Sequence, residues 1–103
     1  MITRVWRGWT AAENADAYEH FLLSGLFPAM RDLPGFRDAD VLRRDEGDEV
    51  AFITLTRFDS LDAIRAFAGE AYDTPVIEPT ARALLARFDK QAQHYETSTF
   101  RRG

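Results

Sequence analysis

The sequence contains no cysteine, and its N-terminus lacks the apolar stretch of a signal peptide or a membrane span. A disulfide framework and thiolate chemistry are therefore excluded, and we expect a cytoplasmic protein with no membrane partner. Positive charge is also limited, because 13 lysines and arginines stand against 17 aspartates and glutamates, for a net charge of −4. Nucleic-acid-binding domains usually carry a basic face, so this balance argues against a nucleic-acid partner.

Several catalytic and binding motifs are absent as well. The sequence has no HExxH, no CxxC, no glycine-rich phosphate loop and no nucleophile elbow. Zinc, nucleotide and covalent hydrolytic mechanisms therefore have no sequence support. The acidic run from Asp45 to Glu49 lacks the ligand spacing of a calcium loop and indicates a solvated turn. We expect no metal site and no cofactor.

The composition is that of one globular domain. Of the 103 residues, 46% are apolar and 29% are charged, which is enough apolar material for one core and too little for two domains. We expect residues 1–103 to form one domain that ends in a disordered, solvated tail at residues 101–103.

Apolar periodicity in the first half predicts a strand, a helix and a hairpin. Residues 2–9 alternate as a strand, and Thr10 with Glu13 forms a capping box that begins a helix. Gly25 and Pro28 are expected to kink or split that helix before it ends near residue 33. Its apolar stripe consists of Ala15, Tyr18, Leu22, Leu26, Ala29 and Leu33.

The second half is expected to follow the same plan. Residues 36–44 and 49–58 form strands joined by an acidic turn at 45–48. Asp59 or Ser60 caps a short helix that ends at Gly69, and residues 75–87 hold one or two helical pieces. A last strand covers residues 91–97.

This order predicts an α+β, ferredoxin-like βαββαβ fold, in which an antiparallel sheet carries both helices on one face and the first strand lies beside the last. The first and third strands have apolar groups on both of their faces. Two helices cover only one face of a sheet, and a bare apolar face is unusual in a soluble monomer. We therefore expect a homodimer formed through the other sheet face.

The sequence also resembles the antibiotic biosynthesis monooxygenase domain family over nearly its whole length. The resemblance implies a dimeric α+β barrel whose members include cofactor-free oxygenases of phenols or quinols, heme-degrading enzymes and proteins without known activity. The segments that carry it are Trp6–Gly8, Ala17–Tyr18, Leu33–Phe36, Val41–Arg44, Phe58–Ile64, Phe67–Glu70 and His94–Glu96.

The heme-degrading branch is disfavoured by three absences. The resemblance implies an asparagine on the first strand, a tryptophan in the second helix and a histidine in the helix after it. The only asparagine is Asn14, the only tryptophans are Trp6 and Trp9, and residues 71–85 contain no histidine. No axial ligand for a heme iron is therefore evident.

Pairing of the chain ends suggests where an active site lies. Side by side, the first and last strands bring Arg4, Trp6 and His94 close together. A histidine with a pKa of about 6.5 suits proton abstraction from a phenol. Arg4 or Arg43 would stabilise the resulting phenolate, while Trp6 and Tyr72 would stack on the ring. His94 and Arg4 are therefore candidate catalytic residues, and Trp6, Tyr72 and Arg43 candidate substrate-binding residues.

Each candidate has a structural alternative. Arg4 opposite Glu96 would form a cross-strand ion pair, Trp6 would fill the core, and His94 would take a satisfied or interfacial position. His20 lies off the apolar stripe and is expected to be exposed.

Three functional hypotheses follow from these patterns. The first is a cofactor-independent monooxygenase of a small electron-rich aromatic substrate. The second is a non-catalytic protein that binds a small ligand in the same cavity. The third is a structural or interaction module whose core is filled by its own side chains.

Overall fold

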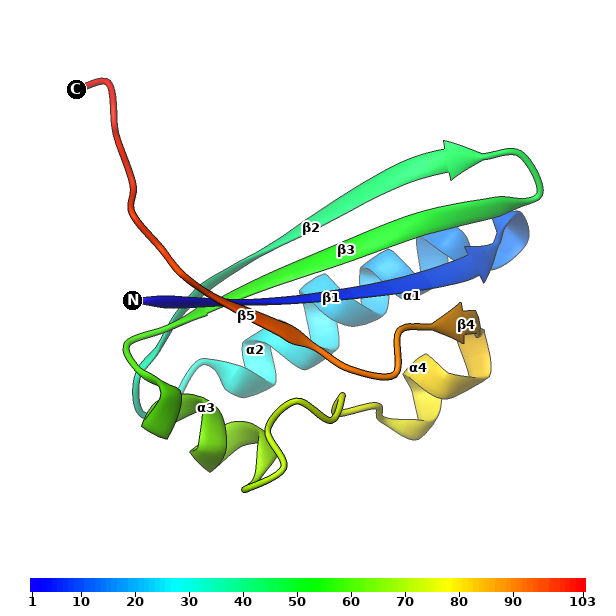
Figure 1. The fold of residues 1–103 in the computed structure, drawn as a ribbon. Coiled ribbons are helices and arrows are strands. Elements are labelled where there is room, and N and C mark those ends of the chain that lie inside the picture. The colour runs from blue at the N-terminus through cyan, green and yellow to red at the C-terminus, as the bar shows by residue number, and fades with distance from the viewer.

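The first strand is the centre of the structure, a computed structural model that describes residues 1–103 (Figure 1). Strand β1 (Ile2–Ala11) pairs antiparallel with β3 (Glu49–Phe58), which pairs on its far side with β2 (Phe36–Glu46). The other edge of β1 is shared by β4 (Leu85–Phe88) and β5 (Gln93–Glu96). This order, β2-β3-β1-β4 with β5 beside β1, confirms the ferredoxin-like arrangement and the pairing of the two chain ends.

The hairpin between β2 and β3 is tighter than the predicted acidic turn. Asp45 and Glu46 still belong to β2, and only Gly47 and Asp48 form the turn. Gly47 has a φ of 81°, the conformation that a glycine-first, two-residue hairpin turn requires. Nothing lies near its missing side chain.

The first helical region is interrupted, as Gly25 and Pro28 predicted. A short 3-10 turn, η1 (Ala12–Asn14), leads into α1 (Ala15–Phe21). A π-helical segment, η2 (Leu22–Leu26), then separates α1 from α2 (Phe27–Met30), which carries Pro28 in its first turn. The helical region ends at Met30, short of the predicted residue 33.

The predicted capping box at Thr10 is wrong. Thr10 remains in β1, where it pairs with Val50, and the residue before the 3-10 turn, Ala11, makes no side-chain cap. The Thr10 hydroxyl is fully buried without a hydrogen-bond partner. Sheet pairing that continues to Ala11 holds Thr10 facing the core, so its side chain is not available to the helix.

The structure of the second helical region matches the prediction at its start but not at its end. Helix α3 (Leu61–Ala68) begins at Ser60, whose hydroxyl accepts a hydrogen bond from the Ala63 amide at 3.2 Å, and it ends at Gly69. Helix α4 (Pro79–Leu84) starts at a proline as expected. Residues 85–87, expected to be helical, instead form β4 together with Phe88, because the end of β1 offers a free edge beyond β5.

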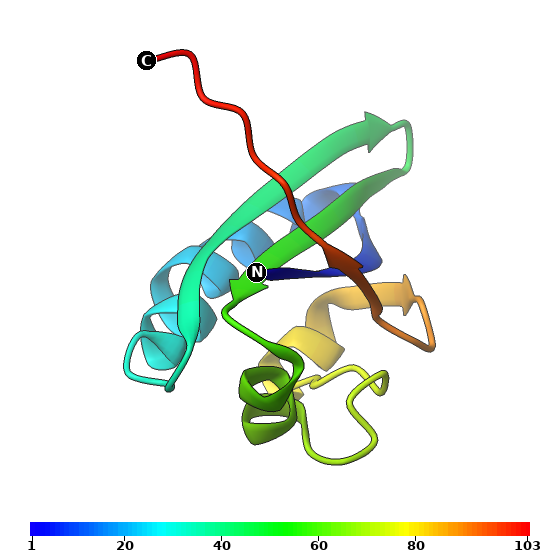
Figure 2. The same cartoon turned by 60° about the vertical axis from the view of Figure 1, so that its left-hand side comes forward.

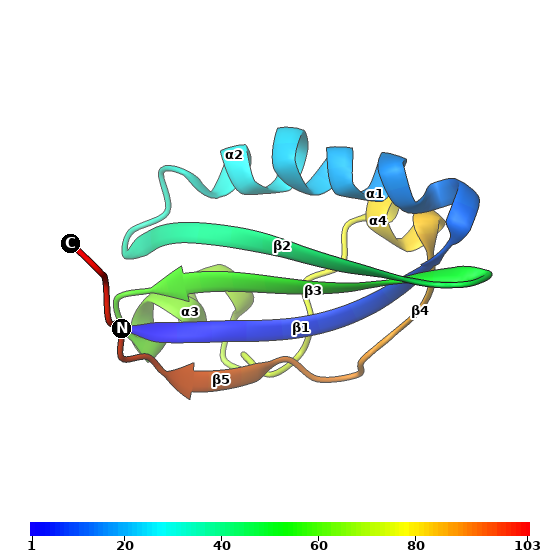
Figure 3. The same cartoon turned by 90° about the horizontal axis from the view of Figure 1, so that it is seen from above.

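The two faces of the sheet differ in how they are covered. Side chains at even positions of β1 and β3 face the helices, among them the buried Phe52 and Phe58. All helices lie on that side, and Figure 3 looks onto the opposite, uncovered face. None of the helices is long and apolar enough to cross a bilayer. Residues 97–103 form no helix or strand and run away from the sheet (Figure 2).

A pair of glycine substitutions tests how tightly α3 packs on the start of β2. Gly35 and Gly47 have nearly the same φ, 80° and 81°, but a Cβ on Gly35 would lie 2.6 Å from the Ala63 Cβ, whereas Gly47 has open space. Gly47→Ala should cost only the backbone strain, about 1 kcal/mol. Gly35→Ala adds overpacking to this strain and should lower the free energy of unfolding, measured with urea, by about 3 kcal/mol. Equal losses would mean that the contact with Ala63 relaxes freely.

Candidate functional site

Arg4 is a buried cation on the helix side of the sheet. It stands on β1 between Thr56 of β3 and His94 of β5, and it is only 5% exposed. Its Nη1 donates to the Tyr72 carbonyl and, at 2.8 Å, to His94 Nε2, while its Nη2 donates to the Thr74 carbonyl at 3.1 Å. A guanidinium has five N–H donors. Three are used here, so two remain, and no ion pair joins the group to a carboxylate.

His94 lies behind Arg4 and connects it to Asp73. The His94 Nδ1 atom is 3.2 Å from Asp73 Oδ1, and the side chain is 9% exposed. Because Nε2 accepts from Arg4, we assign the proton to Nδ1, which donates to Asp73. Burial and the charge of Arg4 lower the pKa of His94, against the opposing effect of Asp73. The imidazole is therefore neutral near pH 7, with its lone pair committed to Arg4.

A cavity lies between the sheet and the helices, with Arg4 in its wall. Its volume is about 50 Å³, and it opens to solvent at its mouth. That space holds roughly four waters, so an aromatic ring needs the wall to move. Eleven of the 16 lining residues are hydrophobic. The apolar wall includes Phe21, Leu22, Leu26, Phe27, Met30, Phe67 and Ala81.

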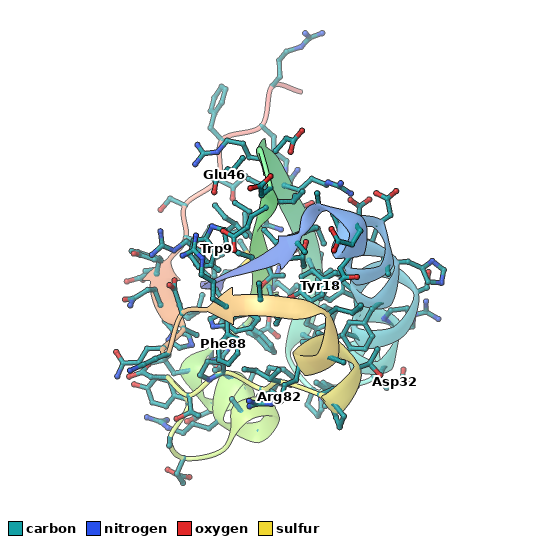
Figure 4. All side chains as sticks on the ribbon, turned by 90° about the vertical axis from the view of Figure 1, so that its right-hand side faces the viewer. Trp9, Tyr18, Asp32, Glu46, Arg82 and Phe88 are labelled. Atoms are coloured by element: carbon teal, nitrogen blue, oxygen red, sulfur yellow. The ribbon has the colours of Figure 1, made fainter.

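The strands supply the polar groups of the cavity. Thr54 and Thr56 line it beside Arg4 and Trp6. The Trp6 indole donates its N–H to the Asp89 carbonyl at 2.8 Å, so only its ring is available to a ligand. Tyr18 of α1 lines the cavity from the helical side. It lies on the same side of the sheet as Phe88, whereas Trp9 lies on the opposite side (Figure 4). Burial raises the pKa of Tyr18 to about 12, so its hydroxyl stays protonated.

The segment between α3 and α4 closes one side of the cavity. Its residues Pro75 to Glu78 line the space. The segment is fastened to the sheet by the two carbonyls that accept from Arg4, and by the Asp73 carbonyl, which accepts from the Ala92 amide at 2.7 Å. It contains no helix or strand between Ala68 and Pro79. The same guanidinium therefore lines the cavity and holds its wall.

The predicted site residues are only partly brought together. Arg4 and Trp6 line the cavity, whereas His94 does not. Tyr72 lies outside it, where its ring meets the edge of His94 at 5.2 Å and the Arg65 guanidinium at 5.3 Å. Only the Tyr72 backbone reaches Arg4.

Arg43 lies apart from the cavity. It forms ion pairs with Asp16 and Glu19 of α1 at 3.0 and 2.9 Å, and both carboxylates raise its pKa. The alternative that Arg4 pairs with Glu96 is wrong, because the register of β5 places Glu96 opposite Ile2. The sequence analysis missed Thr54, Thr56 and Tyr18 as cavity residues, although strict alternation along β3 places both threonines on the side of Phe52.

The buried His94 should make stability depend on pH. Its pKa is lower in the folded protein than its ordinary value, so the unfolded chain takes up a proton first as the pH falls. The resulting contribution to stability is complete above the unfolded value of about 6.5 and is lost below it. The free energy of unfolding, measured with urea, should therefore fall more for the wild type than for His94→Gln when the pH is lowered from 7.5 to 5.5. The glutamine keeps an acceptor for Arg4. Parallel losses in both proteins would remove His94 as the source.

Comparison with known proteins identifies the fold. No family model and no curated protein matches the sequence. Among solved structures, a Deinococcus radiodurans protein, provisionally named an antibiotic biosynthesis monooxygenase, is 15% identical, with a TM-score of 0.67 over 99% of this chain and 97% of that one. MhuD, a heme degrader from Mycobacterium tuberculosis, is 17% identical, with a TM-score of 0.61 over 97% of this chain and 98% of that one.

A mutant of SnoaB, a cofactor-independent oxygenase from Streptomyces nogalater, is 21% identical, with a TM-score of 0.61 over 96% of this chain and 94% of that one. At such identities the likeness establishes the fold, which a heme degrader and a cofactor-independent oxygenase share, so it does not discriminate between their reactions. The chain has the α+β fold of the antibiotic biosynthesis monooxygenase proteins, as its motifs predicted.

Proposed function

We propose that this protein is a monooxygenase that oxidises a small electron-rich phenol or hydroquinone with dioxygen, without metal or flavin. The observation that carries the proposal is the guanidinium of Arg4. It is a buried positive charge with no paired carboxylate and with two uncommitted N–H donors, in the wall of a mostly apolar cavity. Such a group stabilises an anion far more strongly than it would in water.

The chemistry follows from that stabilisation. A phenol bound against Arg4 has its pKa lowered, because the phenolate is favoured over the neutral form. The phenolate passes one electron to dioxygen, and the resulting phenoxyl radical and superoxide combine at a ring carbon. The resulting peroxide takes a proton from solvent. The hydroperoxide then loses water together with the hydrogen of the same ring carbon, which leaves a carbonyl, so one oxygen atom enters the product and the other leaves as water. Trp6 supplies a ring face against which the substrate stacks.

His94 has a positioning role in this proposal. Its Nε2 lone pair accepts from Arg4 and it does not line the cavity, so it is not placed to take a proton from a bound phenol. The substrate proton leaves through the open mouth to solvent. The chain Asp73–His94–Arg4 instead fixes the guanidinium, as a second layer of residues fixes a catalytic group elsewhere. Tyr72 assists through its backbone carbonyl, and Arg43 has no part.

One observation favours the structural alternative. The cavity volume is only about 50 Å³, as expected of a core that is nearly filled by its own side chains. A protein of that kind would bind none of the aromatic ligands discussed below. Binding without oxygen consumption would instead identify a non-catalytic ligand carrier.

Oxygen uptake by an Arg4 variant tests the proposal. With hydroquinones and naphthols as substrates, Arg4→Met should lower kcat/KM by about a hundredfold or more, as the loss of a preorganised oxyanion contact does. Arg37→Met, which removes an exposed arginine paired with Asp59, should leave uptake unchanged.

A second readout separates chemistry from folding. The absorbance of a bound naphthol should show its ionisation at a lower pH in the wild type than in Arg4→Met. Unchanged ionisation in the variant would contradict the role of Arg4 even if turnover fell.

We further infer that a second copy of the chain covers the open sheet face. Apolar side chains occupy the middle of that face: Val5, Trp9, Leu42, Ala51, Ile53 and Leu55. Paired charges of both signs surround them, including Arg7 with Asp89 and Arg87 with Glu49. A face that alternates in sign in this way is complementary to itself, as a two-fold interface requires. The remaining chain offers no element to cover it.

Two exposed leucines test the dimer. Leu42 is 45% exposed on the open sheet face, and Leu23 is 52% exposed on the helical region. Light scattering on a sizing column should give the dimer mass for wild type and for Leu23→Asp. Leu42→Asp places a charge in the proposed interface and should give the monomer mass at micromolar concentration. A dimer that survives Leu42→Asp would place the interface elsewhere.

A further inference from the structure

Tyr18 is a buried residue whose hydroxyl contributes no hydrogen bond to the fold. The residue is 1% exposed, and its ring packs edge-on against Phe52 with 4.9 Å between centroids. Its hydroxyl has no hydrogen-bond partner in the protein, and burial alone accounts for its raised pKa. The Thr10 hydroxyl is also unpartnered but is fully enclosed, whereas that of Tyr18 belongs to a residue that lines the cavity.

The position of Tyr18 along the sheet sets it apart from Arg4. Tyr18 lies over Phe52, which pairs with Gly8, whereas Arg4 pairs with Thr56. Phe52 and Thr56 are four residues apart on β3, which is about 13 Å along a strand. Arg4 and Tyr18 therefore lie near opposite ends of the cavity, with Trp6 and Thr54 of the sheet between them.

We propose that the Tyr18 hydroxyl determines specificity by donating a hydrogen bond to an acceptor oxygen of the substrate, at the end opposite to the ionised oxygen held by Arg4. This inference rests on the proposed function, because it assumes that Arg4 binds the ionised end. A ligand that fills the cavity excludes water from the Tyr18 hydroxyl, and a donor left without a partner then costs free energy unless an oxygen of the ligand accepts from it. A substrate without such an oxygen would leave Tyr18 unsatisfied and bind more weakly.

Two matched ligands separate a hydrogen bond from simple packing. 6-Acetyl-2-naphthol carries a carbonyl oxygen far from its phenol, and 6-isopropenyl-2-naphthol replaces that oxygen with a methylene group of nearly the same shape. Binding to wild type, Tyr18→Phe and Thr56→Val is measured by quenching of tryptophan fluorescence. The substitution of Tyr18 removes one hydroxyl and keeps the ring on Phe52. Thr56 lies beside Arg4 and serves as the control for loss of a cavity hydroxyl at the other end.

The two ligands should respond differently to the loss of the Tyr18 hydroxyl. Tyr18→Phe should lower the affinity for the acetyl compound by about tenfold, which corresponds to the loss of one buried hydrogen bond. The affinity for the isopropenyl compound should change by less than about twofold. Thr56→Val should affect both compounds alike. Comparing each ligand across the proteins cancels the different acidities of the two phenols.

The outcomes also distinguish this inference from the proposed function. Equal changes for both ligands in Tyr18→Phe would overturn the role of Tyr18 and leave the oxygenase proposal standing. Binding that depends on Tyr18, without oxygen uptake for any phenol, would support the role of Tyr18 and overturn the oxygenase. Failure of both ligands to bind to the wild type, together with no oxygen uptake for any phenol or hydroquinone, would overturn both.

Discussion

The burial of one positive charge organises the rest of the site. Arg4 is enclosed between two strands and a segment without regular structure, and a charge in that position needs hydrogen bonds to compensate for its lost hydration. Two backbone carbonyls and one imidazole supply three such bonds and leave two N–H donors for a ligand. Each of these contacts also has a structural consequence. The carbonyls fasten the wall of the cavity, and the imidazole joins β5 to β1 beyond the backbone ladder. A substitution at Arg4 therefore affects the site and its walls together, which is why the ionisation of a bound phenol is more informative than activity alone.

The alternation of side chains along β1 and β3 places the cavity residues on one face of the sheet and the residues proposed for self-association on the other. Even positions place Arg4, Trp6, Thr54 and Thr56 toward the helices, where water is largely excluded. Odd positions place an apolar group of side chains on the uncovered face, with Trp9 between the guanidinium groups of Arg7 and Arg87 at 5.5 and 4.0 Å. A shift of register by one residue would exchange these two sets. Ligand binding and self-association thus depend on the same pairing of β1 with β3, even though they use opposite faces of the sheet.

The sequence predicted what depends on local periodicity and missed what depends on distant partners. Alternation identified β1 and β3, and Ser60 with Gly69 bounded α3, because each signal lies within a few residues. The strand β4 was missed because its pairing depends on the free edge of β1, almost eighty residues away. The capping role of Thr10 failed for a related reason, since strand pairing continues past it. The chemistry of His94 was equally inaccessible, because its neutral state and its committed lone pair follow from the register that places it opposite Arg4.

The narrowness of the cavity connects ligand entry to Arg4. A ring that enters must displace the wall between α3 and α4, and that wall is held by the Tyr72 and Thr74 carbonyls on the guanidinium. Opening therefore frees up to two more donors on Arg4 at the moment when an anion arrives to accept from them. A phenolate oxygen is a stronger acceptor than a peptide carbonyl, so part of the cost of opening is offset by the ligand. A neutral aromatic ligand without an ionisable proton offers no such compensation. Selection for the ionised form would then operate at entry as well as in the bound state, from one buried charge.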